Sequence, residues 1–75
     1  MEIQVKLMGM LRRKSPPGDK LELPEGATIL QALAALDIAA EQVQVVLIND
    51  LPQRDKTQPL QPGDQMTVLA LVGGG

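Results

Sequence analysis

The sequence contains no cysteine, no histidine and no aromatic residue. Without cysteine or histidine there can be no disulfide framework and no zinc site of the usual kinds. The absence of phenylalanine, tyrosine and tryptophan argues against nucleic-acid modules that stack bases on aromatic rings. Because histidine, cysteine and tyrosine are also common catalytic bases and nucleophiles, their absence argues against an enzyme that works alone.

The sequence also has no large excess of charge of one sign and no long apolar run. Seven basic and nine acidic residues give a net charge of −2, so neither a phosphate-binding stripe nor an acidic tail is expected. No run approaches a membrane span, and the N-terminus lacks the layout of a signal peptide. We therefore expect a cytoplasmic protein with no nucleic-acid or membrane partner. With 75 residues, 44% of them hydrophobic, the chain has room for one domain with one core.

Two short alternating segments open the chain. Ile3, Val5 and Leu7 alternate with polar residues, which predicts a strand with one buried face. Residues 20–23 alternate again before Pro24. The intervening residues include glycine, two prolines and a basic cluster, so they predict a hairpin with a long turn.

A helix is predicted next. Thr28 is the expected N-cap, and Gln31 stands at the spacing of a capping box. Ile29, Leu33 and Leu36 form an apolar stripe at helical spacing, and Asp37 is expected to end the regular part.

The second half of the chain predicts three strands. Residues 43–48 are β-branched and almost wholly apolar, typical of a central strand covered on much of both faces. Residues 51–52 allow only a very short edge strand, residues 53–61 look like a polar surface connection, and residues 65–72 form the last strand. One helix after a hairpin can cover one face of a mixed sheet, which predicts a two-layer α+β domain. The first and last strands are the expected parallel central pair, which is the β-grasp arrangement.

Three motifs resemble the ThiS/MoaD family of ubiquitin-like sulfur carrier proteins. They are a strand closing in Leu-Pro-Glu-Gly-Ala-Thr at residues 23–28, the segment Pro59-Leu60-Gln61-Pro62-Gly63-Asp64, and a last strand that runs into Gly73, Gly74 and Gly75. The resemblance implies a β-grasp (ubiquitin-like) fold with a mixed four- to five-stranded sheet and one helix on one face. It divides the chain into a domain of residues 1–72 and a flexible glycine tail of residues 73–75.

The resemblance also implies a chemistry for the tail. In that family an E1-like adenylyltransferase activates the terminal carboxylate with ATP and Mg²⁺, and sulfur then replaces AMP to give a thiocarboxylate. Here the activated group would be the carboxylate of Gly75, with Gly73 and Gly74 as the threaded tail. This chain would bind no cofactor or metal itself. Residues 7–13 resemble the molybdopterin-type small subunits, which favours molybdopterin or tungstopterin over thiamin synthesis. A molybdopterin synthase large subunit, or another sulfur acceptor enzyme, would be the next partner.

The residue types at the C-terminus suit this chemistry. A terminal carboxyl group has a pKa of about 3.3–3.7, so it is anionic at neutral pH and can attack the α-phosphate of ATP. Glycines have no Cβ, so a glycine tail can enter a narrow channel. Three residues extend by about 10 Å, at ~3.3–3.6 Å each, enough to cross a short tunnel.

Two further groups of residues are candidates for partner binding. Arg12 and Arg13 could dock an acidic surface, although a solvated loop is the commoner interpretation of such a cluster. Leu69 and Leu71 would form an apolar patch beside the tail if the sheet face opposite the helix is open. A loop or an oligomer covering that face is the alternative.

Two other functions remain open from the residues alone. The chain could be a ubiquitin-like modifier conjugated to lysines through Gly75. It could also be a β-grasp binding module that never uses its terminus chemically.

Overall fold

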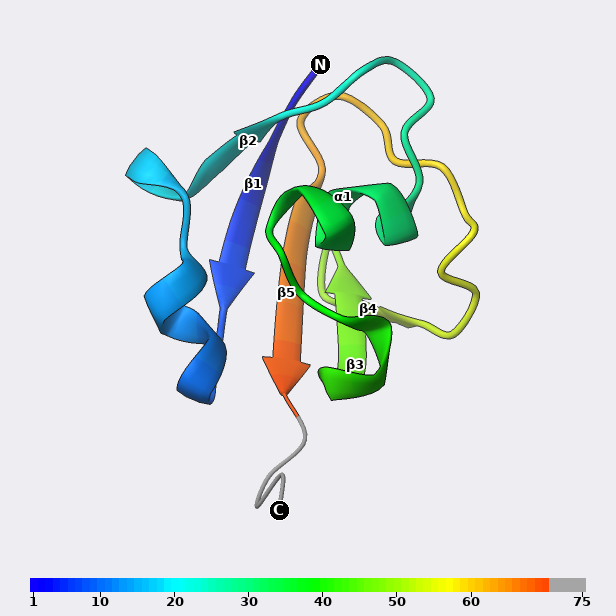
Figure 1. Cartoon of the computed structure of the whole chain (residues 1–75). Helices are drawn as coiled ribbons and strands as arrows, with labels where there is room; N and C mark the ends of the chain where they lie inside the picture. The colour runs from blue at the N-terminus through cyan, green and yellow to red at the C-terminus, as the bar shows by residue number, and fades with distance from the viewer. Residues whose placement is uncertain (71–75) are drawn as a thin grey trace.

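Five strands form one mixed sheet in the computed structural model, which describes residues 1–70. The strands are β1 (Glu2–Leu7), β2 (Lys20–Glu22), β3 (Val43–Ile48), β4 (Leu51–Gln53) and β5 (Gln65–Ala70). Their order in the sheet is β2-β1-β5-β3-β4, and β1 and β5 are parallel neighbours at its centre. The helix α1 (Ile29–Ala35) lies across one face (Figure 1). This confirms the predicted β-grasp fold and its parallel central pair.

The first hairpin has a long turn, as predicted. β1 alternates between exposed and buried residues along its whole length. The turn contains two 3-10 helices, η1 (Gly9–Lys14) and η2 (Pro17–Asp19), where the sequence predicted only a loop. Leu11 explains the first of them, because its side chain is buried and holds η1 against the sheet.

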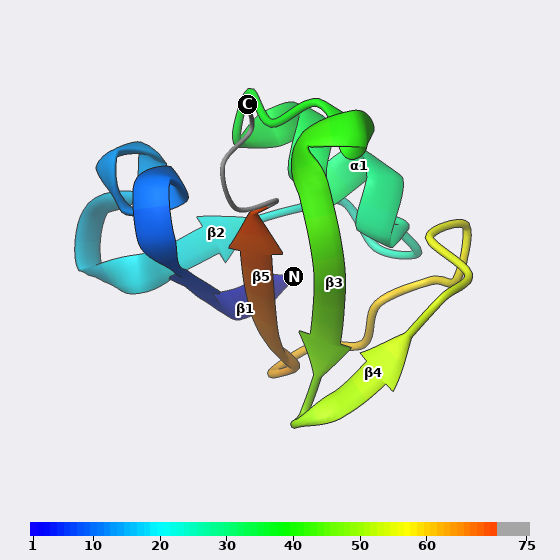
Figure 2. The ribbon, with the colours of Figure 1, turned by 90° about the horizontal axis from the view of Figure 1, so that it is seen from below.

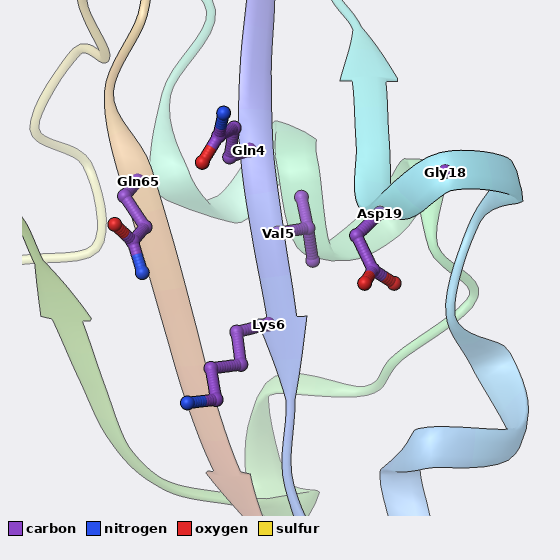
Figure 3. Close-up of a pocket in the computed structure, with 6 residues that line it drawn as sticks. All are labelled: Gln4, Val5, Lys6, Gly18, Asp19 and Gln65. Atoms are coloured by element: carbon purple, nitrogen blue, oxygen red, sulfur yellow. The ribbon is translucent and has the colours of Figure 1, made fainter.

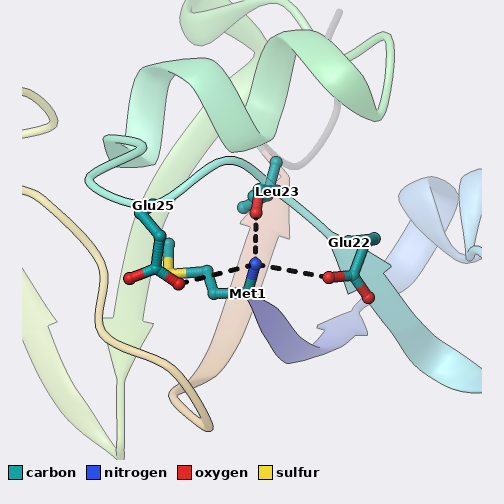
Figure 4. Close-up of polar contacts among 4 residues, drawn as sticks. All are labelled: Met1, Glu22, Leu23 and Glu25. Atoms are coloured by element: carbon teal, nitrogen blue, oxygen red, sulfur yellow. Dashed lines mark hydrogen bonds and ion pairs between the residues drawn. The ribbon is translucent and has the colours of Figure 1, made fainter.

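The α-amino group of Met1 ties the start of β1 to the end of β2. It donates to the carbonyl oxygen of Leu23, and it lies 3.3 Å from Oε2 of Glu22 and 3.8 Å from Oε2 of Glu25 (Figure 4). The backbone N–H of Leu23 donates in turn to the carbonyl oxygen of Met1 at 2.8 Å. These contacts hold the chain where it leaves the sheet for the helix.

The N-terminus of α1 is closed by the predicted capping box. The backbone N–H of Gln31 donates to Oγ1 of Thr28 at 3.2 Å, and the N–H of Thr28 donates to Oε1 of Gln31 at 2.8 Å. The helix ends at Ala35, followed by Leu36 as the C-cap and Asp37 at a φ of 60°. Its buried face, as predicted, carries Ile29 and Leu33 into the core.

The β3–β4 hairpin turns on two residues. Asn49 and Asp50 have φ values of 53° and 71°, as a type I′ turn requires, and this turn matches the twist of an antiparallel pair. The side-chain amide of Asn49 donates to Oδ1 of Asp64 at 3.0 Å, and its Oδ1 accepts from the backbone N–H of Gln65 at 3.0 Å. The hairpin is thereby fastened to the beginning of β5.

Pro52 protects the β4 edge of the sheet. Opposite residues of an antiparallel pair alternate between hydrogen-bonded and non-hydrogen-bonded positions. The N–H of Asn49 donates to the carbonyl of Gln65 on the β5 side, so the backbone of Leu47 also faces β5. Its partner Pro52 therefore stands at a non-hydrogen-bonded position, with its nitrogen toward solvent. Because proline has no N–H, its presence here removes no hydrogen bond between β3 and β4, and it discourages another strand from adding to this edge.

One hydrophobic core lies between the sheet and α1. Its largest fully buried side chains are Ile3, Val5, Ile29, Leu33, Val46, Met66 and Val68. Leu60 is also buried, and its N–H donates to the carbonyl of Ala27 at 2.8 Å, which fastens the β4–β5 connection to the segment before α1. That connection was predicted to lie on the surface, and the burial of Leu60 corrects this. Elsewhere in it, the hydroxyl and N–H of Thr57 bond to Asp55 and lower the pKa of that carboxyl.

Candidate functional site

The C-terminal end of β5 is the centre of the candidate site. β5 lies between β1 and β3, and Ala70, the last described residue, pairs with Val43 at the beginning of β3. Figure 2 looks at this end of the molecule, where the β5 arrow points between the first 3-10 helix on one side and β3 on the other. Of the predicted site residues, Leu71, Gly73, Gly74 and Gly75 lie outside the described residues.

Leu69 lies on the sheet face that α1 does not cover. It pairs with Val45 of β3, and Thr67 on the same face pairs with Leu47. The two β3 side chains and Leu69 are half-buried and Thr67 is 8% exposed, whereas Met66 and Val68 on the helix side are fully buried. We call Val45, Leu47, Thr67 and Leu69 the open-face patch. The predicted patch of Leu69 and Leu71 stays a prediction, because Leu71 lies outside the described residues.

For two members of this patch, the observed exposure differs from the prediction made from the sequence. Residues 43–48 were predicted to be covered on much of both faces, but Val45 and Leu47 remain partly exposed. The reason is that α1 covers one face only. An apolar run fits both a strand buried on two faces and a strand that carries a binding surface, and only the number of covering layers distinguishes them. The sequence already held that signal, because it predicts just one helix.

Arg12 and Arg13 lie on η1, at the same end of the molecule as Ala70. Both side chains are exposed, while Leu11 between Met10 and Arg12 is 3% exposed. The backbone N–H of Met8 donates to the carbonyl oxygen of Val68 at 3.0 Å, so η1 begins directly beside the last residues of β5. The structure therefore brings the basic cluster and Leu69 to one end of the fold.

Lys14 fixes the far end of η1. Its Nζ donates to the carbonyl oxygen of Asp37 and lies 3.8 Å from Oδ2 of the same residue. Asp37 follows α1 and is fully exposed, so this contact is a surface ion pair of small energy, helped by the hydrogen bond to the backbone. It joins the basic segment to the helix layer and leaves Arg12 and Arg13 without an ion pair among residues 1–70.

Across residues 1–70 there is no cluster of acidic side chains arranged to hold a metal ion. Nor does any helix within that range have the length and apolar character needed to cross a membrane.

The fold resembles a solved structure over its full length. The crystal structure of SAMP1 from Haloferax volcanii, a ubiquitin-like β-grasp protein, superposes with a TM-score of 0.73 at 20% sequence identity, covering 100% of both chains. No match was found among curated proteins. The profile of the ThiS family matches residues 5–75. Since this match takes in nearly the whole sequence, the chain belongs to the ThiS family.

Proposed function

We propose that this chain is a sulfur carrier whose Gly75 carboxylate is adenylated in trans and converted to a thiocarboxylate. The observation that carries the proposal is the family match, which runs through the terminal glycines to residue 75. The fold supports it, because the central strand β5 ends at Ala70, three residues before Gly73 in the sequence. A carrier needs its reactive end to project from a rigid body, and a central strand paired on both sides is the most firmly held element available.

The chain contributes the nucleophile and the partner contributes the catalysis. An ionised carboxylate attacks the α-phosphate of ATP and releases pyrophosphate, which leaves an acyl adenylate. A sulfur nucleophile then displaces AMP. An E1-like adenylyltransferase with Mg²⁺ would supply the nucleotide site and the charge stabilisation. The likeness of residues 7–13 to molybdopterin-type small subunits favours a molybdopterin synthase large subunit as the acceptor.

The partner-facing surface is the open-face patch together with Arg12 and Arg13. Apolar groups of the patch lose water on docking, and the two exposed arginines attract an acidic rim. Leu71 lies outside the described residues and remains a candidate contact because it extends the alternation of Thr67 and Leu69 along the sequence.

Thiol-selective alkylation tests this function with little background. The chain has no cysteine, so a maleimide or iodoacetamide reagent has no thiol to modify unless sulfur has been added. The chain would be incubated with its activating enzyme, ATP, Mg²⁺ and a sulfur donor, alkylated, and sequenced by mass spectrometry. We expect the label at Gly75 and only when ATP is present. A label that appears without ATP, or none under any activating condition, contradicts the proposal.

A second function is favoured by the ubiquitin-like fold of the structural neighbour. As a protein modifier, the chain would form an isopeptide bond between Gly75 and a lysine. There is no lysine or arginine after Lys56, so trypsin would leave residues 57–75 attached to the target. Cleavage after Leu71 would leave the shorter Val-Gly-Gly-Gly. Searching cellular proteins for either remnant separates the modifier from the carrier. A chain that keeps full activity without its last two glycines would instead be a binding module with no terminal chemistry.

A further inference from the structure

Pairing between β1 and β2 stops halfway along β1. Glu2, Ile3 and Gln4 face Glu22, Leu21 and Lys20, and β2 contributes no further residue. β1 nevertheless continues to Leu7 and stays paired with β5 to that point. Residues 5–7 of β1 therefore have a neighbouring strand on one side only.

The backbone of η2 explains why β2 leaves the sheet. Gly18 and Asp19 have φ values of 65° and 57°, a left-handed pair that swings the chain away from β1. The N–H of Asp19 donates to the carbonyl oxygen of Pro16 at 3.0 Å. If the register of the hairpin continued, Asp19 would stand opposite Val5. Because the N–H of Asp19 already donates to Pro16, it is not available to the carbonyl of Val5.

The next ladder position is vacant for a different reason. Continuing the same register places Pro17 opposite Leu7, and proline has no N–H to donate. The carbonyl of Pro17 accepts from the N–H of Lys20 within the turn, and no backbone hydrogen bond joins Leu7 to Pro17 among the described residues.

These groups point toward the vacated side of β1. The N–H groups of Gln4 and Met8 donate to the carbonyls of Asp64 and Val68, on the β5 side, at 2.8 and 3.0 Å. Successive residues of a strand direct their backbone groups alternately to its two sides. The carbonyls of Val5 and Leu7, and the N–H of Leu7, consequently face the gap.

The gap is open space at the surface. One hollow is lined by Gln4, Val5, Lys6, Gly18, Asp19 and Gln65, shown in Figure 3. A second hollow is lined by residues of β1, η1 and η2, and shares Lys6 and Asp19 with the first. The two hollows adjoin at Lys6 and Asp19 beside the free half of β1, and the second reaches Arg12 on η1. We call this space the β1 slot.

We propose that an extended, acidic segment of the partner enzyme adds to β1 at the β1 slot and completes the missing half of β2. This rests on the proposed function for the identity of the partner, because the slot opens at the same end as the candidate docking surface. The occupant is an extended peptide, since unpaired backbone groups at strand spacing are what another strand recognises. It is acidic at its centre, since Lys6 and Arg12 outnumber Asp19 among the charges lining the slot.

The probe is a short blocked peptide, acetyl-Val-Glu-Val-amide, titrated into the full chain and followed by amide NMR. Its glutamate would stand opposite Lys6, and its valines opposite Val5 and Leu7. We expect a downfield shift of the Leu7 N–H as it gains an acceptor, with saturation at millimolar peptide, the weak affinity expected for so small a contact area. In the free chain, the Leu7 amide should exchange with deuterium faster than the paired Lys6 amide.

Two matched peptides test whether backbone pairing is responsible. N-methylation of the valine amide that donates to Val5 or Leu7 should weaken binding about five- to tenfold, roughly the value of one hydrogen bond. Replacing glutamate with lysine should also weaken it. Equal binding of the methylated peptide, no Leu7 shift at any concentration reached, or a slowly exchanging Leu7 amide in the free chain would overturn the proposal. Because no activating enzyme or ATP is present, failure here is distinct from failure of the carrier function.

Discussion

The backbone N–H of Met8 donates to the carbonyl oxygen of Val68 at 3.0 Å, which fixes the beginning of η1 beside the last residues of β5. The buried side chain of Leu11 and the contact of Lys14 with Asp37 hold the same segment at two further points. Arg12 and Arg13 are thereby held at the end of the fold where β5 reaches Ala70.

The charge of η1 should control how fast the activating enzyme captures the chain. Reversing both charges, Arg12→Glu with Arg13→Glu, should lower kcat/KM for adenylation by about ten- to a hundredfold at low salt, because steering by complementary charge acts mainly on association. The measurement is ATP–pyrophosphate exchange at several salt concentrations. Arg54→Glu with Lys56→Glu is the matched control, since it changes the net charge equally and both residues follow β4 on the opposite edge of the sheet. Equal losses for this pair and the η1 pair would remove η1 from the interface.

The open-face patch should matter for binding more than for stability. Leu69→Asp places a charge in the patch and should weaken binding to the partner about tenfold or more, because the interface would then bury an unpaired carboxylate. The side chain is only half-buried in the free chain, so unfolding should become easier by about 1 kcal/mol. Met66→Ala is the contrasting change on the helix side of the same strand. It should cost about 2–5 kcal/mol in stability, because Met66 is fully buried. The patch assignment is wrong if Leu69→Asp leaves partner affinity unchanged in a calorimetric titration.

The capping box should be worth a measurable part of the stability. Thr28→Ala removes the oxygen that accepts from the N–H of Gln31 and should cost about 1 kcal/mol. For a domain of this size that lowers Tm by roughly 4–8 °C. Thr28→Ser keeps the acceptor and serves as the control. Because the two hydrogen bonds are reciprocal, Gln31→Ala should lower the free energy of unfolding less in the Thr28→Ala background than in the wild type. Strictly additive losses in the double mutant would show that the capping box does not act as a unit.

The β3–β4 turn should respond in opposite directions to changes at its two residues. Asp50→Gly relieves a left-handed conformation without removing any described hydrogen bond, so Tm should stay the same or rise. Asn49→Ala keeps the strain and loses the bonds to Asp64 and Gln65, so it should cost about 1–2 kcal/mol. Thermal unfolding by circular dichroism measures both. A fall in stability for Asp50→Gly as large as that for Asn49→Ala would rule out the type I′ description.

Much of the fold could be predicted because local signals agree with the global arrangement. Ile3, Val5 and Leu7 alternate, and Thr28 with Gln31 marks a helix start. The 3-10 helix at residues 9–14 was missed because it depends on Leu11 reaching the core, a long-range contact that no local pattern reveals. The partial exposure of Val45 and Leu47 was missed because their pattern does not record how many layers cover a strand.

The candidate site, like the fold, could be predicted from the sequence only in part. Arg12, Arg13 and Leu69 were identified by residue type, but their common location at one end of the molecule follows from the parallel pairing of β1 and β5. The β1 slot was not foreseen at all. It depends on Gly18 and Asp19 both adopting positive φ, and at Asp19 residue type alone does not specify that conformation.

The most direct test of the carrier function is the state of Gly75 in the chain isolated from its native cells. Intact-mass analysis alone is ambiguous, because exchanging oxygen for sulfur changes the mass almost as much as oxidising one of the four methionines. Alkylation followed by peptide sequencing resolves this, since the chain has no cysteine to react. We expect an alkylated sulfur at Gly75 in a fraction of the molecules. A terminus that is never labelled, in cells that are making molybdopterin-type cofactors, would contradict it.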